Sequence, residues 1–260
     1  MSKTVIIIPC YNEASRLPVE EFQQGFKANP EVHFLFVNDG STDNTLSILN
    51  SLKEGNINVD VFDSQPNSGK ANAVRIAMIH ALEHFEFDLI GYFDADLATP
   101  LNQISEFETC FSANKDLKMV VGCRVRRLGA DINRTWKRHI IGRVFATFAS
   151  ATLMLPVYDT QCGAKMICKE TIENLFSEKF ISKWLFDVEV FARLSLLVGF
   201  PNIKKAVYEH PLQVWIEKGD SRIKLKDFIK FPIDLLKIHR KYHSVLKKQI
   251  KNSDKTSYEK

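Results

Sequence analysis

The sequence predicts an α/β domain with a mainly parallel sheet. Three apolar runs, residues 4–8, 33–37 and 89–93, each stop at a polar loop that is followed by a helix-like stretch. Continuous apolar runs, in contrast to alternating ones, are typical of parallel strands that helices cover on both faces. Ligands in such sheets bind beyond the carboxyl ends of the strands. We therefore expect the functional site in the loops that follow these runs.

The polar segments after these three runs carry carboxylates. Glu13 follows the first run, Asp39 follows the second, and Asp94 and Asp96 follow the third. Continued strand alternation would place Asp94 and Asp96 on one face, where both could address one cation. Adjacent carboxylates repel each other unless they are solvated, as in an ordinary turn, or bridged by a hard divalent ion such as Mg²⁺ or Mn²⁺. Four acids at one sheet edge favour a metal, ribose hydroxyls and the donor groups of a base.

Four short segments occur together in a characteristic order. They are residues 9–13 (Pro-Cys-Tyr-Asn-Glu), 38–43 (Asn-Asp-Gly-Ser-Thr-Asp), 67–70 (Asn-Ser-Gly-Lys) and 94–96 (Asp-Ala-Asp). Jointly they resemble the nucleotide-sugar site of the family-2 glycosyltransferases with a GT-A fold, over roughly residues 3–215. Ala71 departs from the Gly-Lys/Arg-Gly pattern usual in that family. The spacing of a P-loop is absent around Gly69-Lys70, which argues against an ATPase.

The resemblance implies a donor site that binds a nucleotide-sugar together with Mg²⁺ or Mn²⁺. Asp96 is the expected main metal ligand, Asp94 is expected on the metal or the ribose, and Lys70 is expected on the diphosphate. Asp39 is expected on the base, and Glu13 on the base or the ribose. The full set of expected donor-site residues is Pro9, Tyr11, Asn12, Glu13, Asp39, Lys70, Asp94, Ala95 and Asp96.

Two later segments, residues 159–165 (Asp-Thr-Gln-Cys-Gly-Ala-Lys) and 184–189 (Trp-Leu-Phe-Asp-Val-Glu), look like the dolichyl-phosphate β-glucosyltransferase branch. This likeness implies UDP-glucose as donor, a polyprenyl phosphate as acceptor and inversion at the sugar. Asp159, Asp187 and Glu189 are the candidates for a base or an acceptor-orienting acid. A hydroxyl acceptor would need such a base, whereas a phosphate monoester, with a second pKa of about 6, is already largely ionised.

A basic cluster follows the strand-like segment Val120-Val121-Gly122. Guanidinium groups bind phosphate oxygens through paired hydrogen bonds, although charge runs can also be merely solubilising. The resemblance implies that Arg124 and Arg143 hold the acceptor phosphate, with Lys137 and Arg138 as helpers. The cluster comprises Arg124, Arg126, Arg127, Arg134, Lys137, Arg138 and Arg143, with Asp131 as its one acid.

The carboxyl-terminal part differs in charge from the rest. Residues 221–251 hold ten Lys or Arg against two Asp, a balance of +8, which leaves −4 for residues 1–220 because the last nine residues are neutral and the chain is +4. Apolar residues interleave with these bases, as in amphipathic helices on anionic membranes. The alternatives are a helix packed back on the domain and a nucleic-acid tail, and the acidic remainder argues against nucleic acid. We expect a catalytic domain at 1–220 and a basic helical tail at 221–260, with Pro232 breaking or restarting the helix.

Cysteine usage, hydropathy and the basic tail together predict a peripheral protein on the cytoplasmic face of a membrane. The five cysteines form no Cys-x-x-Cys pair and follow no signal-peptide pattern, which indicates a reducing compartment. No stretch reaches the ~18 apolar residues of a membrane span. Residues 144–156 are apolar but short, and are read either as a buried helix or as an interfacial helix beside a lipid acceptor.

Other functions remain open at this level. Within the family, the acceptor could be a saccharide or protein hydroxyl. In another class, the acids could serve recognition alone in a non-catalytic nucleotide-binding membrane scaffold. The sequence leaves the sugar, the lipid chain length and the oligomeric state undetermined.

Overall fold

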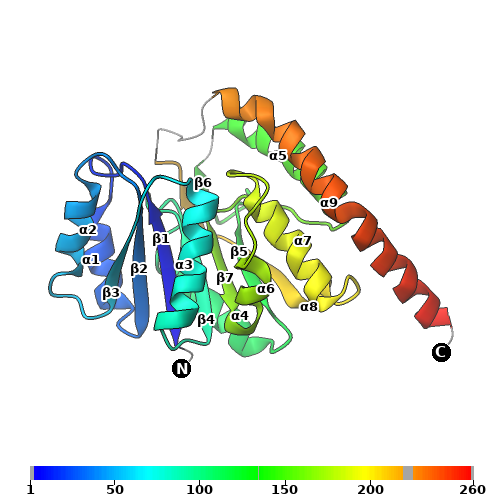
Figure 1. Cartoon of the computed structure of the whole chain (residues 1–260), viewed down its shortest axis with the longest axis horizontal. Coiled ribbons are helices and arrows are strands. Elements are labelled where there is room, and N and C mark those ends of the chain that lie inside the picture. Colours follow the sequence, from blue (N-terminus) through cyan, green and yellow to red (C-terminus); the bar gives the residue numbers. More distant parts are fainter. Residues whose placement is uncertain (1–2, 134, 219–224, 259–260) are drawn as a thin grey trace.

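The computed structural model describes residues 3–133, 135–218 and 225–258, and the side chains of these residues except 137–138, 225–229 and 252–258. Strands and helices alternate through its first half (Figure 1). The strands are β1 (Thr4–Cys10), β2 (Val32–Asp39), β3 (Val59–Ser64), β4 (Leu89–Phe93), β5 (Met119–Cys123), β6 (Asp131–Asn133), β7 (Ala164–Cys168), β8 (Val207–Pro211) and β9 (Val214–Ile216).

Seven of these strands form one sheet in the order β3-β2-β1-β4-β7-β5-β8, and β6 pairs with β9 in a small second sheet. Strand β7 runs antiparallel to both of its neighbours, β4 and β5, while the other pairs are parallel. The prediction of a mainly parallel α/β sheet is confirmed. Because β2, β1 and β4 are adjacent and parallel, their carboxyl ends share one edge, away from the amino terminus in Figure 1.

Helices cover both faces of the sheet. They are α1 (Val19–Ala28), α2 (Thr45–Lys53), α3 (Lys70–His84), α4 (Gln103–Ala113), α5 (Trp136–Leu153), the 3₁₀ turn η1 (Lys169–Thr171), α6 (Ile172–Phe176), α7 (Phe186–Val198), α8 (Ile203–Ala206) and α9 (Leu225–Tyr258). Strand side chains alternate between two cores: Val5 and Ile7 face the core of α3, α6 and α7, whereas Ile6 and Ile8 face that of α1, α2 and α4. Burial on both faces explains the continuous apolar runs of the strands.

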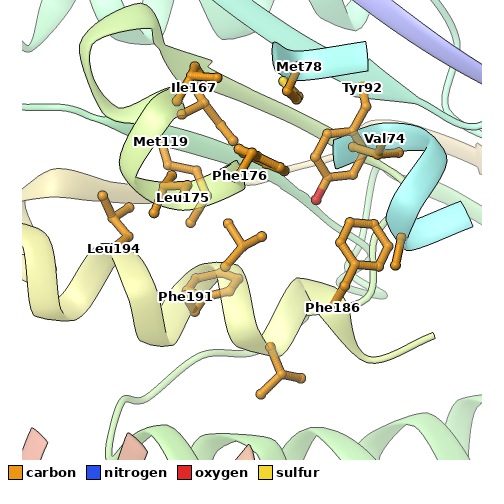
Figure 2. Close-up of a cluster of buried hydrophobic side chains, with 14 of the residues drawn as sticks. Val74, Met78, Tyr92, Met119, Ile167, Leu175, Phe176, Phe186, Phe191 and Leu194 are labelled. Carbon is orange, nitrogen blue, oxygen red and sulfur yellow. The ribbon is translucent and has the colours of Figure 1, made fainter. Parts of the chain in front are cut away.

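The core on the α7 side fixes one helix next to the sheet edge at which the carboxyl ends of β2, β1 and β4 lie. Figure 2 shows Phe186 and Phe191 of α7 packed with Phe176 of α6 and with Tyr92 of β4. The rings of Tyr92 and Phe186 lie 5.8 Å apart between centroids. Since Phe186 is the first residue of α7, this packing fixes the first turn of that helix against the end of β4.

Helix α9 packs back on the domain against α5 and α7 (Figure 1). Leu235, Ile238, Tyr242 and Leu246 are its buried contacts, so this side of the tail is occupied by protein. The prediction that Pro232 breaks the helix is wrong, because α9 continues through it. Pro232 is exposed, and it removes one backbone donor, a loss that the tertiary burial of α9 offsets.

Within the described residues, no helix combines the length and the hydropathy that crossing a bilayer requires. Helix α5 contains most of the apolar stretch at 144–156. Its Ala149 and Leu153 are fully buried, whereas Val144 and Phe148 are 53% and 61% exposed. The helix is therefore a core helix on one side and an open apolar surface on the other.

The packing of α9 leads to a test with two leucines of one helix. Leu246 is fully buried and Leu236 is 49% exposed. We expect Leu246→Ala to lower the free energy of unfolding by roughly 2–5 kcal/mol, because it leaves a cavity in the core that α9 shares with α5 and α7. Leu236→Ala should change it by no more than about 0.5 kcal/mol. Urea unfolding measures both, and equal small effects would show that α9 is not docked.

Candidate functional site

The predicted acids meet at one edge of the sheet. Asp39 is the last residue of β2, Glu13 lies just beyond β1, and Asp94 and Asp96 lie beyond β4. Asp94 and Asp96 lie close enough to interact, as expected. They belong to a turn, however, and not to one face of a strand. Strand β4 ends at Phe93, and Asp94 begins a turn in which the Leu97 amide donates to the Asp94 carbonyl at 3.1 Å.

Asp94 is held by a cation and by the neighbouring strand. Its carboxylate forms an ion pair with the ammonium of Lys70, the first residue of α3. Its amide donates to the carbonyl of Gly163, just before β7, at 2.9 Å. Burial works to lower the pKa of Lys70, but the carboxylates of Asp94, Asp187 and Asp96 outweigh it and raise that pKa. Lys70 therefore stays charged at the centre of the acidic edge.

Asp96, the expected main metal ligand, has a perturbed carboxyl pKa, and its role as a ligand stays a prediction. Its pKa is raised, first by burial and then by the charge of Asp94, while the Ala98 amide hydrogen bond at 3.0 Å acts in the opposite direction. A raised pKa indicates a negative charge without sufficient compensation from the protein. Among the described residues there is no group of three or more His, Cys, Asp or Glu side chains around one point. Asp94 and Asp96 offer oxygen donors that suit Mg²⁺ or Mn²⁺, and further oxygen ligands, such as those of a phosphate, would have to complete the coordination shell.

The loop after β1 is braced against the loop after β2. Asn12 adopts a positive φ of 50°, and its side-chain oxygen accepts from the Thr42 amide at 2.8 Å. The Glu13 carboxylate accepts from the Arg16 guanidinium, including one bond of 2.7 Å.

The other expected donor-site residues of these loops differ in exposure. Tyr11 projects with 39% of its surface exposed. Pro9 is half-buried within β1, and Ala95 is buried in the turn after β4.

Asp39 organises the loop that precedes α3. Its carboxylate accepts from the Asn67 side chain at 2.9 Å, from the Ser68 amide and hydroxyl at 2.8 and 2.9 Å, and from the Gly69 amide at 2.8 Å. Both oxygens are used, so Asp39 sets the approach of this loop to the sheet edge. Direct contact of Asp39 with a base stays a prediction.

The two predicted acceptor arginines converge on one turn, Tyr158-Asp159. Arg124 donates to the Asp159 carboxylate through Nε at 2.6 Å and Nη2 at 2.8 Å. Arg143 donates to the Tyr158 carbonyl at 2.9 Å and lies 3.7 Å from the centroid of the Tyr158 ring. Glu209 of β8 accepts from the Tyr158 and Asp159 amides at 2.8–2.9 Å. This turn therefore holds both guanidinium groups in fixed places.

The ion pair determines the charge state of Asp159. Burial alone would raise the pKa of its carboxyl, but the Arg124 guanidinium and its hydrogen bonds outweigh burial and lower that pKa to about 2. Asp159 is thus a carboxylate that neutralises and orients Arg124. Lys137 and Arg138 have side chains outside the described residues.

Asp187 is anchored in a buried network. The fully buried ammonium of Lys165 lies 2.6 Å from the Asp187 carboxylate, which also accepts from the Tyr92 hydroxyl. Tyr92 of β4 and Lys165 of β7 are direct partners in the antiparallel register, so both side chains leave the sheet on the α7 side. Lys165 also donates to the Cys162 carbonyl at 2.6 Å.

Glu189 lies apart from these groups. It is fully buried and accepts from the Ile181 amide at 2.8 Å, from the Tyr242 hydroxyl of α9 at 2.6 Å and from Arg193 at 3.0 Å. Its carboxylate ties α7 to α9. The structure brings Asp159 and Asp187 toward the sheet edge and leaves Glu189 in the interior.

Sequence reasoning assigned no role to Tyr92, Gly163 or Lys165. A signal for Lys165 was present, because a lysine inside the apolar strand 164–168 must face a core and needs a buried acid there. Tyr92 and Gly163 gave no comparable signal, since their roles depend on which strands become neighbours.

Comparison with known proteins defines the class. The chain belongs to glycosyl transferase family 2, whose model matches residues 5–176, and it is accordingly a glycosyltransferase.

Among curated proteins it is similar to dolichyl-phosphate beta-glucosyltransferase ALG5C of Trichomonas vaginalis, with 32% identity over 90% of this chain and 70% of that protein. The dolichyl-phosphate beta-glucosyltransferase of Saccharomyces cerevisiae is 28% identical over 91% of this chain and 74% of its own length.

Solved structures show the same fold at low identity. Glucosyl-3-phosphoglycerate synthase from Mycobacterium tuberculosis, in complex with Mn²⁺, UDP-glucose and phosphoglyceric acid, matches with a TM-score of 0.67 at 13% identity, over 92% of this chain and 80% of that chain. A mannosyltransferase from Pyrobaculum calidifontis with GDP-Man and Mn²⁺ matches with a TM-score of 0.60 at 17% identity, over 92% and 63%. The GT-A fold expected from the sequence is confirmed.

The Arg124–Asp159 pair predicts a pH dependence of stability. Because the pKa of Asp159 is lowered from 3.8 to about 2 in the folded protein, the pair stabilises the fold above about pH 4, and that contribution is lost as pH falls toward 2. The lost free energy is about 2 kcal/mol. Urea unfolding should show the advantage of the wild type over Asp159→Asn narrowing by this amount between pH 5 and pH 2. A difference in unfolding free energy between the two proteins that stays constant from pH 5 to pH 2 would contradict this explanation. Asp116→Asn, at an exposed site, is the control.

Proposed function

We propose that this chain is an inverting, metal-dependent glucosyltransferase that moves glucose from UDP-glucose to a polyprenyl phosphate such as dolichyl phosphate. The observation that carries the proposal is the junction of two unlike sites. Asp94 of the acidic edge contacts Gly163, and the turn at residues 158–159, to which Arg124 and Arg143 bind, ends four residues earlier in the same segment. A site for a metal-bound diphosphate thereby adjoins a site for a second phosphate.

The donor assignment rests on the chemistry of the acidic edge and on the relatives. Asp96 and Asp94 would hold Mg²⁺ or Mn²⁺, which supplies charge neutralisation at the departing diphosphate. Lys70 sits between them and Asp187 and remains charged, so it can meet a phosphate oxygen. The structural neighbours that contain UDP-glucose or GDP-mannose together with Mn²⁺ support this reading.

The acceptor assignment rests on the state of the candidate bases. Asp159 is paired with Arg124, Asp187 with Lys165, and Glu189 is buried against α9. Each of these acids is committed to a cation or to a hydroxyl of the protein. A phosphate acceptor needs no strong base, because it is already ionised, and guanidinium groups match its oxygens. These pairings favour a phosphate acceptor over a saccharide or protein hydroxyl.

The proposed reaction follows from these positions. Arg124 and Arg143 would hold the lipid phosphate so that one of its oxygens faces the anomeric carbon. Lys70 would contact the leaving diphosphate on the other side, where Asp94 and Asp96 would hold the divalent ion that neutralises its charge. Attack from the face opposite the leaving group inverts the anomeric configuration. Positioning and charge neutralisation would supply most of the acceleration.

Transfer of radiolabelled glucose from UDP-glucose into an organic-extractable product tests the proposal. We expect transfer with dolichyl phosphate and Mn²⁺ or Mg²⁺, and loss of transfer in excess chelator. Asp96→Asn should reduce turnover by about 100-fold or more, because the metal contributes several kcal/mol to the transition state. Asp116→Asn should be unaffected. Label that appears only in a water-soluble saccharide would support a hydroxyl acceptor, and no turnover with any donor would support a non-catalytic scaffold.

We propose further that the protein contacts the lipid surface through the exposed side of α5. The inner apolar side of α9 is packed on the domain and is not available for this contact. Trp136, Ile140, Val144 and Phe148 follow one another at intervals of four residues and are 48–65% exposed, so they form one stripe. Ile141 of α5 and Ile233 and Leu236 of the adjacent α9 add exposed apolar surface. Exposed bases of α9 complement anionic headgroups, namely Lys230, Lys237, Arg240, Lys241, Lys247, Lys248 and Lys251.

The α5 stripe can be tested without touching the donor site. Trp136→Glu with Phe148→Glu should weaken binding to anionic vesicles by about tenfold or more, because two large apolar side chains no longer insert. Ile57→Glu, at a fully exposed loop position elsewhere, is the matched control. Co-sedimentation at low and high salt is the measurement. Unchanged binding by the double variant would reject α5 as the inserted surface.

A further inference from the structure

Gly163 is a glycine for reasons of space and not of backbone conformation. Five glycines of the described chain have a positive φ, and Gly163 is not among them. A Cβ built on Gly163 would lie 1.8 Å from Oδ2, 2.3 Å from Cγ and 2.9 Å from Oδ1 of Asp94. The Asp94 carboxylate thus occupies the volume that any other residue at position 163 would fill.

The neighbouring contacts leave Asp94 little freedom to move aside. The pairing of β4 with β7 reaches Phe93 opposite Ala164, and the Asp94 amide continues it by donating to the Gly163 carbonyl at 2.9 Å. From the helix side, the Lys70 ammonium holds the same carboxylate. A side chain at position 163 would force Asp94 away from Lys70, or would open the end of the β4–β7 pairing.

We propose that Gly163 is a positioning residue of the donor site: its bare Cα makes the space in which the Asp94 carboxylate lies beside Lys70, and so sets the affinity of the site for metal-bound UDP. This inference rests on the proposed function, because it takes the ligand of Asp94 and Asp96 to be a nucleoside diphosphate with a divalent cation. Gly163 itself touches neither ligand, and acts through Asp94.

The effect differs from that of an ordinary crowded glycine. A Cβ at Gly25 of α1 would lie 2.3 Å from Cδ1 of Leu101, which is the far end of a flexible apolar side chain. Leu101 can rotate with little consequence for charged groups. Gly25→Ala is therefore a matched control for crowding that does not involve a carboxylate.

Calorimetric titration of UDP into the full-length protein, with Mn²⁺ and with chelator, tests the proposal. We expect Gly163→Ala to weaken Mn²⁺-dependent UDP binding by about tenfold or more, in the range found when a partner of a metal ligand is changed. UDP binding in chelator should change by less than about twofold, since Asp39 and the loop at 67–69 remain in place. Gly25→Ala should match the wild type in both conditions. Thermal unfolding of each variant measures the cost to the fold separately.

A double-mutant cycle separates positioning through Asp94 from a general disturbance. In an Asp94→Ala background, Gly163→Ala should have no further effect on Mn²⁺-dependent UDP binding. Equal losses in both backgrounds, or wild-type affinity of Gly163→Ala with Mn²⁺, would overturn the role of Gly163 while leaving the proposed function intact. If the affinity of the wild type for UDP is the same with and without Mn²⁺ or Mg²⁺, the proposed function is overturned, and this inference with it.

Discussion

The buried ion pair between Lys165 and Asp187 is the constraint around which the functional edge is built. A fully buried ammonium is costly unless an acid neutralises it, and removing one partner of such a pair typically costs about 3–5 kcal/mol. Lys165 leaves β7 in register with Tyr92, and Asp187 in the first turn of α7 meets both. The pair therefore fixes α7 against the sheet and fixes β7 against β4.

One short segment transmits this constraint to the rest of the site. At one end, Asp159 orients Arg124; near the middle, Gly163 receives the Asp94 carboxylate; at the other end, Lys165 anchors Asp187. Residues 159–165 thereby set the spacing between the acidic edge at Asp94 and the turn to which Arg124 and Arg143 bind. An inverting glycosyltransferase with a phosphate acceptor needs such a spacing, because the acceptor phosphate must reach the anomeric carbon from the side opposite to the departing diphosphate.

The sequence predicted what depends on local pattern. Continuous apolar runs gave the parallel strands, and the acids at their ends gave the edge where Glu13, Asp39, Asp94 and Asp96 meet. It could not supply the antiparallel insertion of β7 between β4 and β5, which depends on pairing between distant residues. The roles of Tyr92, Gly163 and Lys165 arise from that insertion. Likewise, the helical periodicity of the tail showed an apolar face but not its partner, and that face packs on α5 and α7.

In the proposed reaction, the acceptor phosphate binds beside Asp159, at one end of this segment, and the donor diphosphate binds at the acidic edge beside Gly163. A crystal structure with UDP, Mn²⁺ and a water-soluble, short-chain polyprenyl phosphate tests it most directly. We expect the UDP diphosphate beside Lys70, Asp94 and Asp96, and the lipid phosphate against Arg124 and Arg143. A lipid phosphate bound away from both arginines, or a diphosphate bound at the arginines in place of the acidic edge, would contradict it.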